Sequence, residues 1–536
     1  MARQGAAPHA QRAEQEIRQR AALTLVLESR AVESLERLAA FRRRGAGRAR
    51  KAQVSGVYFE DDGHRLRSRK LSLGVIRSAR GYVQALQAKH LQIGPAVVRR
   101  EWMGPVPTQD PVVSAFGDRE IRSLMPPRKG VLRPVVRSCV ERTTRRLEFP
   151  DGGAVTVDFD LGETNTDSSQ HPVHEITLRL DSGGFDRLFD LALELREVLP
   201  FSLSTETWVE RALARLAEET PASHKSTRLV LPRNANVAEA LTKIVQHCLE
   251  HLLANEACIL ASEDTEGVHQ MRVALRRLRS ALRTFRPLLP ADQVKRLNDE
   301  AKFLAGELAE ARDWDVFDEE LVAPLASTFE SLDDFHVFRA RIAAERQRSR
   351  HKARDAVRSD RYTRFLLEVG AWITRQGWQG QGDGETAGQL QGPLADFSNA
   401  TLDKQHRRVC KAGRQFETLP IAERHQMRID VKRLRYSSDF FGSLYGRKAV
   451  KAYGRYLAEL QDALGYLNDV AVAQELVERL CASTKGRSTE QCRLAGGMVI
   501  GWHSHVLAAS EPRLVENVKH FLDSTPYWSQ VRRRPA

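Results

Sequence analysis

The chain has 536 residues, 42% of them hydrophobic, and its 83 lysines and arginines outnumber its 69 acidic residues, which gives a net charge of +14. This length exceeds what one hydrophobic core normally organises, so two or three compact units are expected, and the cationic excess favours an acidic partner. A charged start, the lack of any run of about 20 apolar residues and six scattered cysteines argue against a signal peptide, a membrane span, a disulfide framework and a zinc site. We therefore expect a cytoplasmic protein.

The segment from Val54 to Leu180 is mostly of period 2, which predicts antiparallel β-strands. Between Val155 and Leu161, apolar side chains alternate with threonine and aspartate. A solvated sheet and a barrel with a polar interior both fit this alternation, and the pattern does not separate them. Residues 185–199 and 207–216 are predicted to be helices, and residues 217–236 are predicted to be a linker.

From Val237 onward helical periodicity dominates, with a glycine- and glutamine-rich interruption at residues 377–392. An eleven-residue basic motif occurs twice in this region. HQMRVALRRLR begins at His269, and HQMRIDVKRLR begins 156 residues later at His425. The same offset separates the aspartates of ARDWDV and LNDVAV. The matched spacing indicates that one helical unit has been duplicated.

Each copy of the motif places its basic residues along one narrow face of a helix, because they follow one another in steps of three and four residues. The opposite face is apolar in both copies. Cations that follow one another at about 4.5 to 6 Å along a helix repel unless an anion lies between them, and guanidinium groups bind phosphate oxygens in pairs. The leading histidine adds a donor whose charge changes near neutral pH. The stripes are His269, Arg272, Arg276, Arg279 and Arg283 in the first copy, and His425, Arg428, Lys432 and Arg435 in the second.

A solvated surface is the alternative interpretation of a basic helix face. Two copies in register, each with its histidine, favour a surface that faces a ligand, and a repetitive polyanion fits it best. Nucleic acid is a weaker candidate, because the stripes lack aromatic residues placed to stack on bases. We expect Asp313, Asp315 and Asp469 to be structural, each pairing with an arginine.

The region from Val237 to Trp528 resembles the CHAD family, the conserved-histidine α-helical domain. The resemblance rests on VHQMRVALRRLRSALRTF, ARDWDVF, HQMRIDVKRLRYSSDFF, LQDALGYLNDVAVA, GWHSH and TPYW, which occur in that order. It implies two four-helix bundles whose basic helices bind inorganic polyphosphate. The ligand-facing residues that it implies are His269, Arg272, Arg276, Arg279, His425, Arg428, Lys432 and Arg435. Arg283 extends the first stripe, and Lys404, Arg408 and Lys411 form a smaller basic face.

The region from Arg12 to Leu216 resembles the CYTH family of triphosphate tunnel enzymes, in segments such as VYFEDDGHRLRSRKLSLGVIR, RSCVERTTRRLEFPDGGAVTVDFDLGE and LSTETWVERAL. The resemblance implies an eight-stranded tunnel with an ExExK strand that holds a divalent metal. In this chain Arg20, Ala22 and Thr24 fall at the ExExK positions; a second register, which leaves too long a gap to the next helix, would place Glu14, Glu16 and Arg18 there. Further departures are Gly74, Gln87, Met103, Thr177 and Trp208.

Six polar residues of the tunnel pattern are retained: Glu101, Asp160 and Glu175 as weak catalytic candidates, and Arg137, Arg145 and Arg211 as anion-binding candidates. We find no convincing metal cluster and expect a catalytically weak or inactive tunnel.

The prediction is therefore an α+β protein with a tunnel domain at 12–216, a linker at 217–236 and a helical domain at 237–530, with halves at about 237–375 and 395–530. We expect it to bind inorganic polyphosphate, without a required cofactor, and to associate with polyphosphate granules. The alternative is an inorganic triphosphatase that depends on magnesium or manganese and uses the helical domain as an accessory.

Overall fold

The computed structural model describes residues 16–28, 48–79, 81–116, 125, 131–216, 220–379, 384–483 and 485–529. The chain divides into two compact units, one formed by residues 1–220 with 366–375 and the other by residues 221–365 with 376–536. The first unit is rich in strands and the second is helical, which confirms the predicted α+β class.

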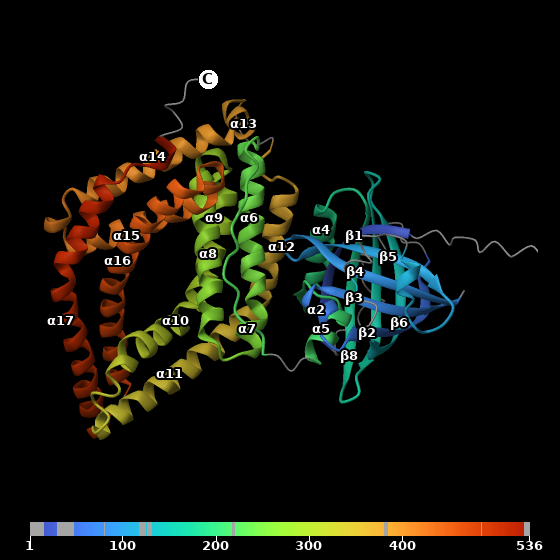
Figure 1. Cartoon of the computed structure of the whole chain (residues 1–536), viewed down its shortest axis with the longest axis horizontal. Coiled ribbons are helices and arrows are strands. Elements are labelled where there is room, and N and C mark those ends of the chain that lie inside the picture. Colours follow the sequence, from blue (N-terminus) through green and yellow to red (C-terminus); the bar gives the residue numbers. More distant parts are fainter. Residues whose placement is uncertain are drawn as a thin grey trace, which may run out of the picture. The chain divides into compact units, whose positions relative to one another are not determined.

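The first unit is built on a closed barrel of antiparallel strands (Figure 1). Eight strands follow one another in the order β5-β4-β3-β2-β6-β7-β8-β1, and β1 also pairs with β5, which closes the barrel. Closure removes the exposed edges of the sheet and decides against the solvated-sheet alternative. A ninth strand, β9, pairs with β1. The strands are β1 (Glu16–Leu27), β2 (Arg50–Asp61), β3 (Leu71–Ser78), β4 (Gly81–Ile93), β5 (Ala96–Val106), β6 (Leu132–Glu148), β7 (Ala154–Asn165), β8 (Gln170–Ser182) and β9 (Phe201–Ser204).

Within the described residues, three short helices accompany the barrel: α2 (Arg65–Ser68), α4 (Asp186–Arg196) and α5 (Trp208–Arg215). The last two confirm the helices predicted at 185–199 and 207–216. Helix α5 begins with a capping box, in which Thr207 accepts a hydrogen bond from the Glu210 backbone and the Glu210 side chain accepts one from the Thr207 backbone. Its apolar face packs into the barrel core against Tyr58 and Val140.

The C-terminal region is helical, as predicted. Its helices are α6 (Val237–Ala254), α7 (Glu256–Ala261), α8 (Thr265–Phe285), α9 (Ala291–Glu307), α10 (Ala309–Val316), α11 (Asp333–Arg358), α12 (Asp360–Thr374), α13 (Gly384–Gln391), α14 (Leu394–Gly413), α15 (Ile421–Phe441), α16 (Arg447–Ala482) and α17 (Arg487–Asp523). Within the described residues, none of the helices combines the length and the hydropathy needed to cross a membrane.

Two segments differ in detail from their description in the sequence. Residues 221–236, predicted as linker, belong to the helical unit, because Leu231 and Ala235 are buried there. The glycine-rich interruption is not all irregular, since residues 384–391 form α13 and bury Leu390. In both segments one or two apolar side chains suffice to dock a polar stretch.

The two basic motifs form helices of equal length at the predicted offset. Helix α15 begins and ends 156 residues after α8, and each is followed by a 3-10 turn, η3 (Arg286–Leu288) after α8 and η7 (Gly442–Leu444) after α15. The predicted apolar faces are buried, with Met271, Leu278, Met427 and Leu434 at most 1% exposed. Burial of these faces leaves the basic stripes as the other face of each helix.

Candidate functional site

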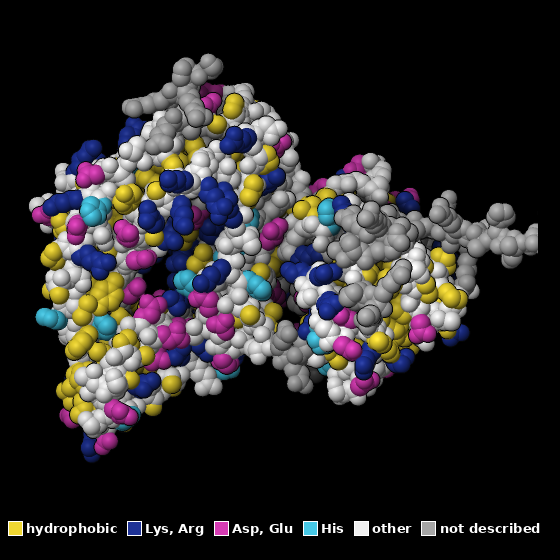
Figure 2. Space-filling model, viewed as in Figure 1, with side chains coloured by type: hydrophobic (Ala, Val, Ile, Leu, Met, Phe, Trp, Pro, Cys, Tyr) yellow, Lys and Arg dark blue, Asp and Glu magenta, His cyan; other side chains and the backbone are white. Residues whose placement is uncertain are grey.

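The basic faces of α8 and α15 meet in the helical unit, where the two helices contact one another and α8 also contacts α10. Figure 2 shows lysine and arginine side chains gathered on one side of a hollow in this unit, with acidic side chains on another side. Helix α8 is started by Asp264, whose side chain accepts a hydrogen bond from the Glu266 backbone at 2.9 Å. Five half-buried stripe residues interact with one another here, and we call His269, Arg272, Arg276, Arg428 and Lys432 the central cluster.

The central cluster holds positive charges close together in a partly desolvated place. Burial, followed by the charges of Arg428 and Arg276, lowers the pKa of Lys432 to about 7. Burial also lowers the pKa of Arg272 to about 10, with Arg276 adding to the effect. For His269, burial and then the charge of Arg312 lower the pKa to about 4, so this imidazole is neutral at pH 7. Such shifts mean that the surrounding protein does not neutralise the cluster.

The arginines of the cluster also carry hydrogen-bond donors that the protein leaves unused. The Nε atoms of Arg272, Arg276 and Arg428 are buried and have no partner among the described residues. One terminal nitrogen of Arg272 donates to the Ala305 carbonyl at 2.8 Å, which fixes the direction of that side chain. A buried donor without an acceptor costs about 1–3 kcal/mol. An anion with several oxygens would supply the missing acceptors.

Two aspartates lie near the cluster without neutralising it. Asp313 acts on Arg272, and Asp469 acts on Arg428 and Lys432, but neither aspartate forms an ion pair within the described residues. The pairing predicted for these two is therefore not found. Burial raises the pKa of Asp313. Asp315 behaves as predicted, since its buried carboxylate pairs with Arg346 at 2.9 Å and with Arg350 at 3.3 Å.

The barrel encloses a second polar site, a cavity of about 150 Å³ in which carboxylates are matched to arginines. Arg142 donates two hydrogen bonds of 2.6 Å to Asp160. Asp158 pairs with Arg179 at 2.8 Å and accepts from Thr144 at 2.7 Å. The two aspartates are buried, so their pairing with arginine offsets the desolvation of both charges.

The other two carboxylates that line the cavity are also paired with arginines. Glu101 accepts a hydrogen bond from Gln87 at 3.0 Å and lies 3.7 Å from the Arg20 guanidinium. Glu175 pairs with Arg211 at 2.6 Å, and burial raises its pKa. Of the predicted tunnel residues, Glu101, Asp160 and Glu175 therefore lie in the cavity, and Arg211 is occupied by a carboxylate.

Strand alternation corrects the choice of arginines in β6. Val136 and Val140 are buried in the barrel core and Arg142 lines the cavity, so the even-numbered side chains of this strand face inward. Arg137 and Arg145 have odd numbers and point away, and the prediction that they bind an anion in the tunnel was wrong.

The departures from the tunnel pattern have a structural role. Thr24, Ala22 and Arg20 line the cavity, as the first register predicts, whereas Glu14 of the second register and the side chain of Glu16 lie outside the described residues. A Cβ atom on Gly74 would lie 2.5 Å from the Tyr58 ring. The missing side chain makes room for that ring inside the barrel.

Tyr58 in turn packs edge-on against Trp208, with ring centroids 5.7 Å apart, and both residues are buried. The Trp208 indole donates to Asp160 at 3.3 Å. Two aromatic rings thus occupy the interior beside the carboxylates.

These residues do not fit a divalent metal. Oxygen ligands must be free to coordinate Mg²⁺ or Mn²⁺, but all four cavity carboxylates are engaged by arginine, and the described residues contain no group of three His, Cys, Asp or Glu side chains that could hold a metal ion. In this cavity the negative charges of the carboxylates are balanced by the positive charges of the arginines that contact them.

Comparison with known proteins places the helical region in a family. The family model described as CHAD domain matches residues 243–478. The structure of the CHAD domain from the plant Ricinus communis is 33% identical, and the match covers 98% of that chain and 57% of this one, with a TM-score of 0.48. Residues 243–478 of this chain are therefore a CHAD domain.

Other known proteins are similar to this chain over different shares of its length. The uncharacterized protein Rv2226 of Mycobacterium tuberculosis is 25% identical over 82% of this chain and 84% of its own length, so the match extends over both units. PptA from Streptomyces chartreusis is 16% identical, with a TM-score of 0.41, over 53% of this chain and all of its own. HpAC1 from Hippeastrum, for which a dominant triphosphatase activity is described, is 13% identical with a TM-score of 0.27, and the match covers 38% of this chain and 99% of that one.

The remaining stripe residues of the CHAD domain lie outside the central cluster. Arg279 turns toward Asn298 of α9, with its Nε 3.3 Å from the amide oxygen. His425 and Lys411 are exposed, and Arg435 is half-buried. Arg283, Lys404 and Arg408 line a separate pocket together with two arginines that the sequence patterns did not single out, Arg286 and Arg433.

Proposed function

We propose that this protein binds inorganic polyphosphate through the central cluster of its CHAD domain. The observation that supports this most strongly is the convergence of Arg272, Arg276, Arg428 and Lys432 from two helices, with three guanidinium Nε donors left without acceptors in the described chain. If the role of the cluster were only structural, we would expect a carboxylate of the protein to form ion pairs with these cations. A chain of phosphates brings both the charge and the oxygens.

The arrangement favours a long polyanion over a single phosphate. The cations lie along helices α8 and α15, whose successive stripe positions rise by about 4.5 to 6 Å, and a repetitive anion can contact several at once. Each contact with phosphate releases counterions, so the affinity should fall steeply with salt. His269 is neutral in the free protein and becomes a donor of charge when an anion binds beside it.

We propose further that the barrel is a scaffold without hydrolytic activity. Each of the four carboxylates that line its cavity is paired with an arginine, and the interior is partly filled by Tyr58 and Trp208. The alternative function, a metal-dependent inorganic triphosphatase, is favoured only by the presence of those carboxylates in one cavity. It would require the arginines to release them.

The test uses the purified full-length protein with polyphosphates of increasing chain length, and with DNA as a competitor. We expect affinity to rise with chain length and polyphosphate to displace DNA. The proposal fails if long-chain polyphosphate does not bind at low salt. A parallel assay measures phosphate released from tripolyphosphate with magnesium or manganese. Turnover that is lost in the Glu101→Gln and Glu175→Gln variants would establish the triphosphatase instead.

The proposed setting is the cytoplasm, on polyphosphate granules. A protein with a free polyphosphate site and no hydrolysis can coat such particles without consuming them. A fluorescent fusion that stays diffuse in cells with visible granules would contradict this location.

A further inference from the structure

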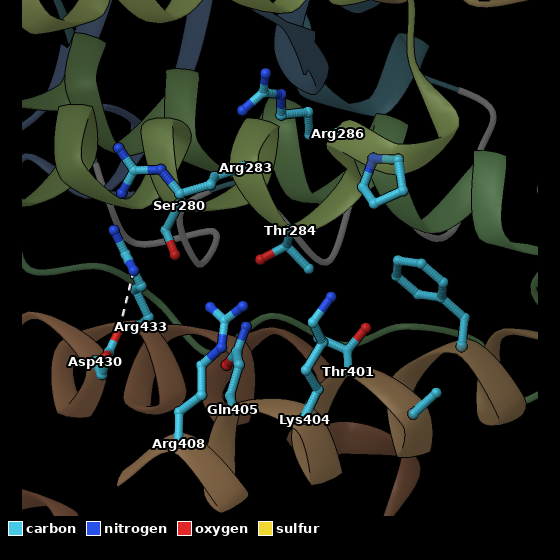
Figure 3. A pocket seen from close by; sticks show the side chains of 13 residues that line it. Ser280, Arg283, Thr284, Arg286, Thr401, Lys404, Gln405, Arg408, Asp430 and Arg433 are labelled. Carbon is cyan, nitrogen blue, oxygen red and sulfur yellow. Dashed lines mark hydrogen bonds and ion pairs between the residues drawn. The ribbon is translucent and has the colours of Figure 1, made fainter. Parts of the chain in front are cut away.

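A basic pocket of about 370 Å³ lies in the helical unit between the C-terminal half of α8, helix α14 and helix α15. Figure 3 shows Lys404 and Arg408 rising from α14 toward Ser280 and Thr284 of α8, with Arg433 at one side. Five cationic side chains line the pocket against a single carboxylate, Asp430. This is a large excess of one sign of charge for a pocket of this size.

The cations of the pocket are mostly without partners. Asp430 is already paired with Arg433 at 2.9 Å. Arg283, Arg286, Lys404 and Arg408 form no ion pair within the described residues. Burial and the charges of other arginines, Arg433 first among them, lower the pKa of Arg283. These positive charges therefore repel one another. A bound anion would balance them and stabilise the arrangement.

The pocket contrasts with the equivalent place in the first half of the CHAD domain. Counted by the offset of 156 residues, Arg433 corresponds to Arg277 and Arg283 corresponds to Asp439. Arg277 pairs with Asp439 at 3.4 Å. At the equivalent contact in the other half, Arg433 stands in the place of Arg277 and Arg283 in the place of Asp439. An ion pair in one half is therefore replaced by two like charges in the other.

Helix α14 differs from α6 in the same sense. Lys404 and Arg408 correspond to Cys248 and Leu252 of α6, which are each 1% exposed. That side is also covered by the chain before α6, since the Leu231 backbone donates to Ser443 at 2.9 Å. A structural surface at this level of the fold is therefore apolar and covered, and the pocket is open and cationic instead.

We propose that this pocket is a second anion site, separate from the central cluster, which binds a compact oligophosphate group. Its volume lies at the lower end of the range for small-molecule sites, about 300–1,000 Å³, and the guanidinium and ammonium groups provide the donors that phosphate oxygens accept. The hydroxyl groups of Ser280, Thr284 and Thr401 add neutral donors. Two sources carry this chemistry, a free short oligophosphate and a nucleoside triphosphate.

The test is calorimetric binding of tripolyphosphate and of ATP to the full-length protein. The variant Lys404→Glu/Arg408→Glu changes two exposed residues of the pocket, and Arg407→Glu, an exposed arginine of the same helix outside the lining, is the matched control. We expect the pocket variant to weaken tripolyphosphate binding by about tenfold or more, because two charge-assisted contacts are lost, and the control to leave it within about threefold. The melting temperatures of both variants are compared with that of the unaltered protein to check that they fold.

The two ligands identify the source. Equal binding of tripolyphosphate and ATP points to a bare oligophosphate group, and tighter ATP binding that is lost in the pocket variant points to a nucleotide. The proposal is overturned if the pocket variant binds both ligands as the unaltered protein does.

The result is independent of the proposed function. Loss of tripolyphosphate binding with retention of long-chain polyphosphate binding supports two separate sites. Arg276→Ala/Arg428→Ala could abolish binding of both tripolyphosphate and long-chain polyphosphate while the pocket variant still binds both. In that case the pocket proposal fails and the proposed function stands. If only tripolyphosphate binds, and only through the pocket, the proposed function fails and the pocket stands.

Discussion

Replacing Arg276 with alanine tests the central cluster most directly, because its charge acts on Arg428 and on Lys432 of the other helix. A hydrogen bond to a charged group contributes about 1.5–3 kcal/mol, which corresponds to about 10- to 150-fold in affinity. Each phosphate contact contributes about 0.7 to the slope of log affinity against log salt concentration for a flexible single-stranded polyanion. Arg276→Ala should therefore weaken binding of long-chain polyphosphate at least about tenfold and reduce that slope by about 0.7.

The assay is a titration of fluorescently labelled polyphosphate at several salt concentrations, with Arg407→Ala as the control for loss of one positive charge elsewhere. The control should shift affinity slightly and leave the slope nearly unchanged, since Arg407 is exposed on α14. The reasoning is refuted if Arg276→Ala has the same slope and the same affinity as the unaltered protein. It is also refuted if Arg407→Ala weakens binding and reduces the slope as much as Arg276→Ala does.

Three other outcomes follow from the same contacts. Polyphosphate affinity should decline as pH rises above about 7, where free Lys432 loses its charge, and Lys432→Arg should flatten this profile; an unchanged profile in the variant would exclude Lys432 as its source. Gly74→Ala should lower stability by about 1–3 kcal/mol in chemical denaturation, because its Cβ meets the Tyr58 ring, and Tyr58→Leu in the same chain should restore part of the loss. Arg142→Ala should cost about 3 kcal/mol or more by leaving Asp160 with only an indole donor; a melting temperature that does not change would show that the pair contributes little.

Local pattern was sufficient for the elements and for part of the site. The steps of three and four in α8 and α15 place their cations on one face and their apolar residues on the other, because helix geometry fixes both. The period-2 alternation in β7 could not distinguish an open sheet from a barrel. That choice depends on the pairing of β1 with β5, which joins residues far apart in the chain.

The tunnel residues show the same division. The loss of glutamates at Arg20, Ala22 and Thr24 is visible in the letters of the sequence. The choice of Arg137 and Arg145 was wrong because neither the register of β6 nor the partner of Arg142 is a local property.

The sequence by itself determined which helices are basic, which faces are apolar and which tunnel residues are replaced, since these follow from residue type and from periods of two and 3.6 residues. The tertiary structure alone decided how the cations are grouped. Arg276 and Lys432 come together across two helices, and Arg283 joins Arg433 and Lys404 in a different pocket. The physical reason is that desolvation and repulsion depend on distances between side chains of different helices, and helix packing sets those distances.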